Sequence, residues 1–220
     1  DSVHWLESLG VEFKDEIGSA TGSLGQRSHY PATPSGNTYI RSFQQFIDDN
    51  ADAIMLLNDM QAKELILDDA GAVVGVKALY DGEQEVTVNC GAVVIATGGF
   101  GGNVEYRQKV NTGVWKEVVL DDSIGCTNIK PCAQGEGMVL AENAGAELIC
   151  LSDIQLHPCG TPGTGLMEDI RTSGRNRIFV NTDGKRFVNE GAERDVLCKN
   201  IFAQPDGTYW IVVNTLRYPD

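Results

Sequence analysis

Residues 91–102 carry the strongest indication of the fold: Gly91-Ala92-Val93-Val94-Ile95-Ala96-Thr97-Gly98-Gly99-Phe100-Gly101-Gly102. Its first half is a short apolar run, which is typical of a buried parallel strand. Its second half holds four glycines, whose main chain can approach a flat or phosphorylated ligand because no Cβ intervenes. The spacing is not GxGxxG, so these residues alone leave two interpretations open: a ligand-binding turn, or a tight turn that ends a strand.

On both sides of this segment the chain alternates helical and strand patterns, which predicts an α/β (α+β) fold. Apolar residues at helical spacing predict helices over residues 3–10, 39–47 and 137–146. Residues 53–57 and 91–96 are expected to be parallel strands, and residues 63–67, 73–80 and 85–89 a β-meander joined by Asp-Ala-Gly and Asp-Gly turns. Residues 18–37 are predicted to be a loop.

The composition changes beyond about residue 151, and we place a domain boundary near residue 152. Five arginines gather in the following forty or so residues, although the whole chain is acidic: Arg171, Arg175, Arg177, Arg186 and Arg194. Residues 177–181 and 186–189 flank Thr182-Asp183-Gly184-Lys185, which predicts a hairpin with an Asp-Gly turn.

Charge and hydropathy exclude several classes of partner. Seventeen Lys and Arg against 31 Asp and Glu give a net charge of −14, which repels a phosphate backbone and an anionic membrane surface. No apolar run approaches the roughly 18–20 residues of a membrane-spanning helix. The six cysteines form no CxxC pair, so we expect scattered free thiols and no metal site.

Four ordered motifs resemble the FAD-dependent fumarate reductase and succinate dehydrogenase flavoprotein family, above all its soluble, single-chain members. The first, residues 93–100, resembles the family's ATGGF segment. The second runs from Thr127-Asn128 through Gly135-Glu136-Gly137 to residues 141–146, with Glu136 in place of the usual Asp. The third is Ile154-Gln155-Leu156-His157-Pro158-Cys159, with Cys159 in place of Thr, and the fourth lies within residues 177–195, around Gly184-Lys185-Arg186-Phe187-Val188-Asn189-Glu190 and Arg194-Asp195.

The resemblance implies the middle of a longer flavoprotein. Residues 1–152 would be part of an FAD-binding domain whose N-terminal GxGxxG unit is absent from this chain, and residues 153–220 would begin a smaller capping, or clamp, domain. It implies FAD as cofactor, a small unsaturated carboxylate as substrate, and an electron donor outside this chain, namely a haem or flavin carrier. The fragment by itself is then expected to bind FAD poorly and to be inactive.

The implied reaction is reduction of an activated C=C bond, with hydride from the flavin and a proton from the protein. By resemblance Arg194 lies at the position of the proton-donating arginine, and Glu168 and Arg171 form the relay that returns the proton to it. Since Arg is effectively always protonated, an arginine acid requires such a relay. The residues alone also allow the plainer interpretation, in which Arg194 pairs with Asp195 or Glu190 and Glu168–Arg171 is a surface ion pair.

Further site residues follow from the same resemblance. His157 is expected to bind the substrate carboxylate, together with Met167 and Glu168. The expected flavin contacts are Ala62, Thr97, Gly98, Thr127, Asn128 and Glu136.

Three departures from fumarate-specific members concern the substrate pocket. Ala20 and Gly165 stand where those members place Met residues, and Met167 stands where they have Thr. The loss of two large side chains and one hydroxyl predicts a roomier, less polar pocket, suited to a larger enoate such as an aryl acrylate.

Two other functions remain open at the level of sequence. One is a flavin-dependent dehydrogenase or oxidase on the same scaffold, acting on succinate, a steroid or an amino acid. The other is a non-catalytic domain used for docking.

Overall fold

The computed structural model describes residues 1–19, 25–33, 36–126, 132–162 and 177–213. These residues form two compact units. The first unit takes its described residues from 1–58, 171–197 and 209–220, and the second from 59–170 and 198–208. The predicted boundary near residue 152 stays a prediction.

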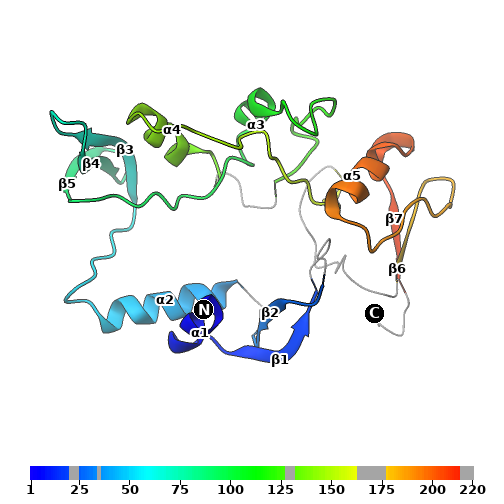
Figure 1. Ribbon diagram of the computed structural model, residues 1–220, viewed down its shortest axis with the longest axis horizontal. Helices are drawn as coiled ribbons and strands as arrows, with labels where there is room; N and C mark the ends of the chain where they lie inside the picture. The colour runs from blue at the N-terminus through cyan, green and yellow to red at the C-terminus, as the bar shows by residue number, and fades with distance from the viewer. Residues whose placement is uncertain (20–24, 34–35, 127–131, 163–176, 214–220) are drawn as a thin grey trace. The chain divides into compact units, whose positions relative to one another are not determined.

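The second unit is built on the predicted β-meander, β3 (Met60–Leu67), β4 (Val73–Tyr80) and β5 (Gln84–Asn89), antiparallel in the order β3-β4-β5 (Figure 1). The first turn is held by Asp68, whose side chain accepts hydrogen bonds from the main-chain N–H groups of Ala70 and Ala72. In the second turn Asp81 and Gly82 both have positive φ, as a primed hairpin turn requires. The meander predicted from the turn residues is therefore confirmed.

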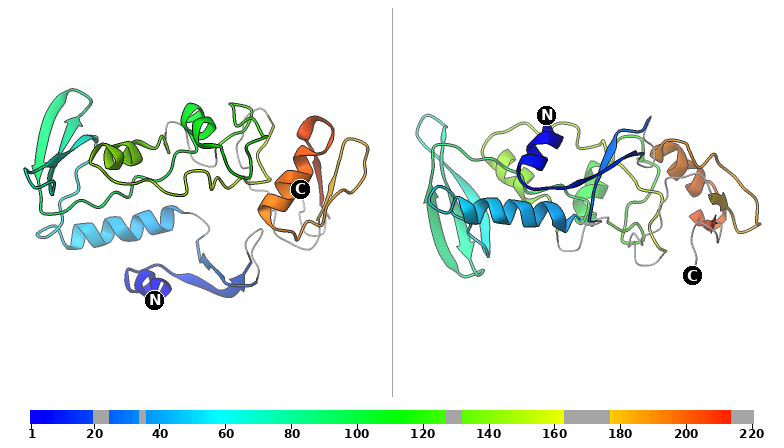
Figure 2. Two further views of the ribbon diagram at one scale, coloured as in Figure 1. Left: turned by 45° about the horizontal axis from the view of Figure 1, so that its top comes forward. Right: turned by 90° about the horizontal axis from the view of Figure 1, so that it is seen from below.

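Two helices complete the part of this unit that matters for function. The helix α4 (Glu136–Asn143) lies beside β3 in both Figure 1 and Figure 2. The helix α3 (Val104–Val110) begins at Asn103, whose side chain accepts a hydrogen bond from Tyr106 N at 3.0 Å. The helix predicted over residues 137–146 corresponds to α4, whereas α3 was not predicted.

The first unit holds α1 (Ser2–Ser8), the hairpin of β1 (Phe13–Gly18) and β2 (Ser28–Pro31), and α2 (Asn37–Asp49). It also holds the antiparallel pair β6 (Arg177–Val180) and β7 (Trp210–Val213). The predicted helices over residues 3–10 and 39–47 correspond to α1 and α2, which contact each other through Trp5 and Phe43, with ring centroids 5.9 Å apart. The predicted loop over residues 18–37 is wrong in part, because it contains β2.

The prediction of two parallel strands, over residues 53–57 and 91–96, is wrong for the described residues. Residues 53–57 and 91–96 form no ladder, and every strand pair among the described residues is antiparallel. Met55 is 82% exposed and Val94 is 89% exposed, so neither apolar run is covered as a buried strand would be. The physical reason is that a strand exists only with a hydrogen-bonding neighbour, and the described residues supply none to either run.

The predicted hairpin over residues 177–189 is also corrected. Its turn is present, since Gly184 N donates to Asn181 O at 2.9 Å and Gly184 has a φ of +73°. Its second arm is reduced to one bridge, between Val180 and Arg186, and β6 pairs instead with β7. A non-local strand therefore replaces the local partner that the turn signal suggested. The segment after the turn leads into an unpredicted helix, α5 (Arg194–Phe202), followed by a short 3-10 turn, η1 (Pro205–Gly207).

Each unit has a small buried core. In the second unit Trp115 and Leu120 are fully buried; Trp115 Nε1 donates to Ile154 O at 2.8 Å, and Phe202 meets the indole edge-on. In the first unit Phe179 is fully buried and lies against Tyr209, with ring centroids 4.6 Å apart. Among the described residues, no helix combines the length and hydropathy needed to cross a membrane.

Candidate functional site

The glycine-rich turn, residues 97–102, has an open half at Gly98 and Gly99 and a packed half at Gly101 and Gly102. Gly98 has a φ of +79°, and a Cβ placed on Gly98 or Gly99 would meet no atom within 4 Å. A Cβ on Gly102 would lie 2.5 Å from Cys132 O, and one on Gly101 would lie 3.1 Å from Cys126 Sγ. The first two glycines therefore leave main chain uncovered for a ligand, while the next two anchor the turn to neighbouring loops.

The N-terminal residues of α4 pack directly against this turn. Gly135 N donates to Gly99 O at 3.1 Å, and Gly135 has a φ of +81°. A Cβ on Gly137 would lie 2.1 Å from Thr97 Oγ1 and 2.6 Å from Ile95 Cγ2. Only glycine permits this approach. It brings the positive end of a helix dipole next to the open half of the turn, an arrangement that favours negatively charged ligand groups.

Glu136 lies in the first turn of α4 and is held from β3. Gln61 Nε2 donates to Glu136 Oε1 at 3.0 Å. Successive side chains of a strand point to opposite faces, so Gln61, not its neighbour Ala62, reaches the carboxylate. Gln61 was not singled out from the sequence, because nothing in its spacing relates it to a residue 75 positions away.

Four of the six predicted flavin contacts are described, and all four belong to the second unit. Thr97, Gly98 and Glu136 lie at the contact between the turn and α4, and Ala62 follows the Gln61 that bonds Glu136. Thr127 and Asn128 lie outside the described residues. These residues fit FAD: uncovered glycine main chain, a helix N-terminus and a fixed carboxylate are groups that can contact a flavin nucleotide.

The predicted substrate residues are only partly described. His157 is half-buried, with its Nδ1 shielded from solvent, and it precedes the buried Pro158. Arg194 is half-buried at the first position of α5. His157 belongs to the second unit and Arg194 to the first. The structure therefore gives no distance between these two side chains. Met167, Glu168 and Arg171, like Ala20 and Gly165, lie outside the described residues, and their predicted roles stay predictions.

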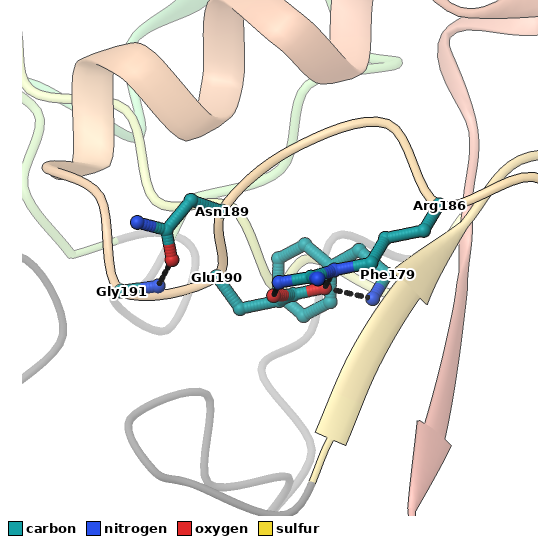
Figure 3. A network of polar contacts seen from close by, with 5 residues as sticks. All are labelled: Phe179, Arg186, Asn189, Glu190 and Gly191. Carbon is teal, nitrogen blue, oxygen red and sulfur yellow. Dashed lines mark hydrogen bonds and ion pairs between the residues drawn. The ribbon is translucent and has the colours of Figure 1, made fainter.

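The segment that leads to Arg194 is organised around Glu190 (Figure 3). Its Oε1 accepts from Phe179 N at 2.8 Å and from Arg186 Nε at 3.0 Å, while its Oε2 accepts from a terminal nitrogen of Arg186 at 2.7 Å. The Glu190 side chain is only 7% exposed. Glu190 is thus engaged by Arg186 and by β6, while the plainer interpretation, in which Arg194 pairs with Asp195 or Glu190, stays a prediction.

The environment of Glu190 shifts its pKa in opposing directions. Burial raises the pKa, but the hydrogen bonds from Arg186 and from the Phe179 N–H lower it more, so the net pKa lies below the ordinary 4.5. In turn Glu190 raises the pKa of Arg186. The carboxylate therefore stays ionised through the neutral range and fixes the loop between β6 and α5.

Comparison with known proteins identifies a flavin-binding family. A family model described as "FAD binding domain" matches residues 1–213. Among similar sequences, NADH:acrylate oxidoreductase of Vibrio harveyi is 37% identical over 99% of this chain and 21% of that protein. Urocanate reductase of Eggerthella lenta is 37% identical over 73% of this chain and 26% of that protein.

A solved structure shares the fold. The open conformation of a flavocytochrome c3 fumarate reductase matches with a TM-score of 0.73 and 25% identity, over 99% of this chain and 37% of that one. The chain thus spans between 21% and 37% of the length of these three proteins.

The first prediction concerns the close approach at Gly137. In the full-length protein, Gly137→Ala should lower the unfolding free energy by about 1–3 kcal/mol, because the new methyl group overlaps Thr97 and Ile95. It should also reduce the amount of FAD retained on purification. Thermal melting and the flavin absorbance per protein measure the two effects. Gly91→Ala is the control, since a Cβ there meets nothing within 4 Å; equal behaviour of the two variants would contradict the prediction.

The second prediction concerns pH. Because the folded pKa of Glu190 lies below its unfolded value, its contribution to stability is full above about pH 4.5 and is lost as the pH falls through the folded pKa. Glu190→Gln should therefore melt at a lower temperature than wild type at pH 7, and the gap should narrow below pH 4. Melting curves from pH 3 to 7 measure this, with the exposed Glu193→Gln as control. A gap that is constant with pH would exclude ionised Glu190 as the cause.

Proposed function

Because this chain belongs to the FAD binding domain family, we propose that it forms part of a flavin-dependent reductase that saturates the C=C bond of an α,β-unsaturated carboxylate. The predicted family, an FAD-dependent oxidoreductase class and FAD as cofactor are confirmed. The observation that carries the proposal is the glycine contact between the turn at Thr97–Gly99 and the start of α4. The names of the relatives, an acrylate oxidoreductase, a urocanate reductase and a fumarate reductase, support a carboxylate substrate.

Bound FAD would supply the hydride for the β-carbon of the alkene. The chain's own groups have two tasks: to hold the carboxylate so that negative charge can develop toward it, and to deliver a proton to the α-carbon. We assign the first task to His157, with Met167 and Glu168 lining the same site. We assign the second to Arg194, which Glu168 and Arg171 reprotonate. The electron donor is a haem or flavin carrier outside this chain.

The substrate we propose is an enoate larger than fumarate. The support is the sequence: small residues at Ala20 and Gly165, and Met167 in place of a hydroxyl-bearing Thr. Without that hydroxyl, the pocket has one hydrogen-bond donor fewer for the second carboxylate of fumarate. With smaller side chains lining it, the pocket has room for the ring of an aryl acrylate.

The third prediction tests this substrate class. The full-length protein, reduced with viologen, is expected to reduce aryl acrylates and other bulky enoates with a higher kcat/KM than fumarate. Initial rates of viologen oxidation over a panel of enoic acids measure the order. Faster turnover of fumarate than of every bulkier enoate would contradict the substrate class but not the reaction. Dye reduction by saturated acids, with no enoate reduction, would instead favour an oxidative enzyme.

The fourth prediction tests the proton donor. Arg194→Ala should lower kcat by about 10²–10⁴-fold, the usual contribution of a general acid, while FAD content is unchanged. The exposed Arg41→Ala, in α2, is the matched control and should keep wild-type kcat. Enoate reduction and flavin absorbance are measured on the same samples. An Arg194→Ala enzyme with unchanged kcat would exclude Arg194 as the acid and would favour a non-catalytic role for this region.

A further inference from the structure

The strongest unassigned feature of the second unit is the buried guanidinium of Arg107. Arg107 lies in α3 and is only 4% exposed. Burial of a charged group is costly unless hydrogen bonds replace its water. An arginine buried this deeply in a short helix therefore needs a specific set of partners.

The partners are five main-chain carbonyls, one for each N–H donor of the guanidinium. Nε donates to Leu120 O at 2.7 Å. One terminal nitrogen donates to Gly101 O at 2.9 Å and Gly125 O at 3.5 Å. The other donates to Asp121 O and to Ile124 O, the latter at 2.6 Å. Four of the carbonyls belong to residues 120–125, and the fifth belongs to the glycine-rich turn.

This arrangement joins two segments through one side chain. The loop 120–125 wraps around the guanidinium, and the same group holds Gly101, two residues beyond the open half of the turn. The turn is tied from its other side as well: Gly102 N donates to Ala133 O at 2.9 Å, and Asn103 Nδ2 donates to Gln134 O at 3.1 Å. Loss of Arg107 would remove the hydrogen bond to Gly101 O and leave this end of the turn tied to residues 133–135.

The positive charge of Arg107 also acts on the carboxyl group of Asp121 in the loop 120–125. The pKa of Asp121 is lowered, first by hydrogen bonds from Ser123 and in smaller part by the positive charge of Arg107. Asp121 Oδ1 accepts from Ser123 N at 2.9 Å, which closes a tight turn inside the loop. The loop is therefore ordered by an Asx turn and by a central cation together.

We propose that Arg107 is a positioning residue for the flavin site: it holds the glycine-rich turn against the loop 120–125 and so sets the main-chain geometry at Thr97–Gly99 that FAD meets. The inference rests on the proposed flavin site. It concerns cofactor affinity, not the chemical step. Lysine cannot replace Arg107 fully, because it offers three donors from a single nitrogen in place of a planar fork of five.

The fifth prediction uses the full-length protein with Arg107→Met, Arg107→Lys and the control Lys109→Met, which removes an exposed charge from the same helix. Titration of the apoproteins with FAD, followed by flavin fluorescence, should give a Kd raised at least tenfold for Arg107→Met. We expect a smaller increase for Arg107→Lys and wild-type affinity for Lys109→Met. Hydrogen exchange should accelerate in peptides covering residues 97–102 and 119–126 of the Arg107 variants.

Each outcome decides between a positioning role and a purely structural one. A Kd within threefold of wild type in folded Arg107→Met would overturn the proposal even if this variant melts early. If Arg107→Met does not fold, Arg107→Lys alone decides. The proposed function fails separately: a wild-type protein that binds FAD but reduces no enoate would refute the reductase and leave the Arg107 measurement intact.

Discussion

The contact between the start of α4 and the glycine-rich turn is the constraint on which the candidate site depends. Gly137 lies so close to Thr97 that no side chain fits between them, and Gly135 is hydrogen-bonded to Gly99. The main chain at Gly137 therefore lies directly against the side chains of Thr97 and Ile95, and the glycine permits this approach because it has no Cβ. The result is a helix N-terminus beside uncovered amides, a combination suited to a phosphorylated, flat cofactor.

In each unit, polar side chains fix segments that have no regular ladder. In the second unit the buried Arg107 pairs its donors with carbonyls and Gln61 holds Glu136. In the first unit the buried carboxylate of Glu190 holds Arg186 and the main chain of β6. Apolar packing is non-directional, whereas a fully paired polar group specifies the position of each partner. Loops that must present main chain to a ligand gain a defined shape in this way without a regular ladder.

The exposed apolar runs at residues 53–57 and 91–96 have the composition of central strands but no neighbour among the described residues. This chain spans only 21% and 37% of the length of two of the proteins that it matches. A run of Val, Ile and Ala carries strand propensity, but propensity forms no strand until another backbone provides the hydrogen bonds.

Local signals in the sequence determined the elements that local physics controls: the meander with its Asp-Gly turns, the helices α1, α2 and α4, the Asp-Gly turn before Lys185, and the motifs that indicated the flavoprotein family. The sequence did not reveal that β6 pairs with β7, that Gln61 bonds a carboxylate 75 positions away, or that Arg107 is enclosed by carbonyls from a distant loop. These contacts join residues with no regular spacing. Only the folded chain, in which burial requires each polar group to find a partner, decides which distant atoms meet.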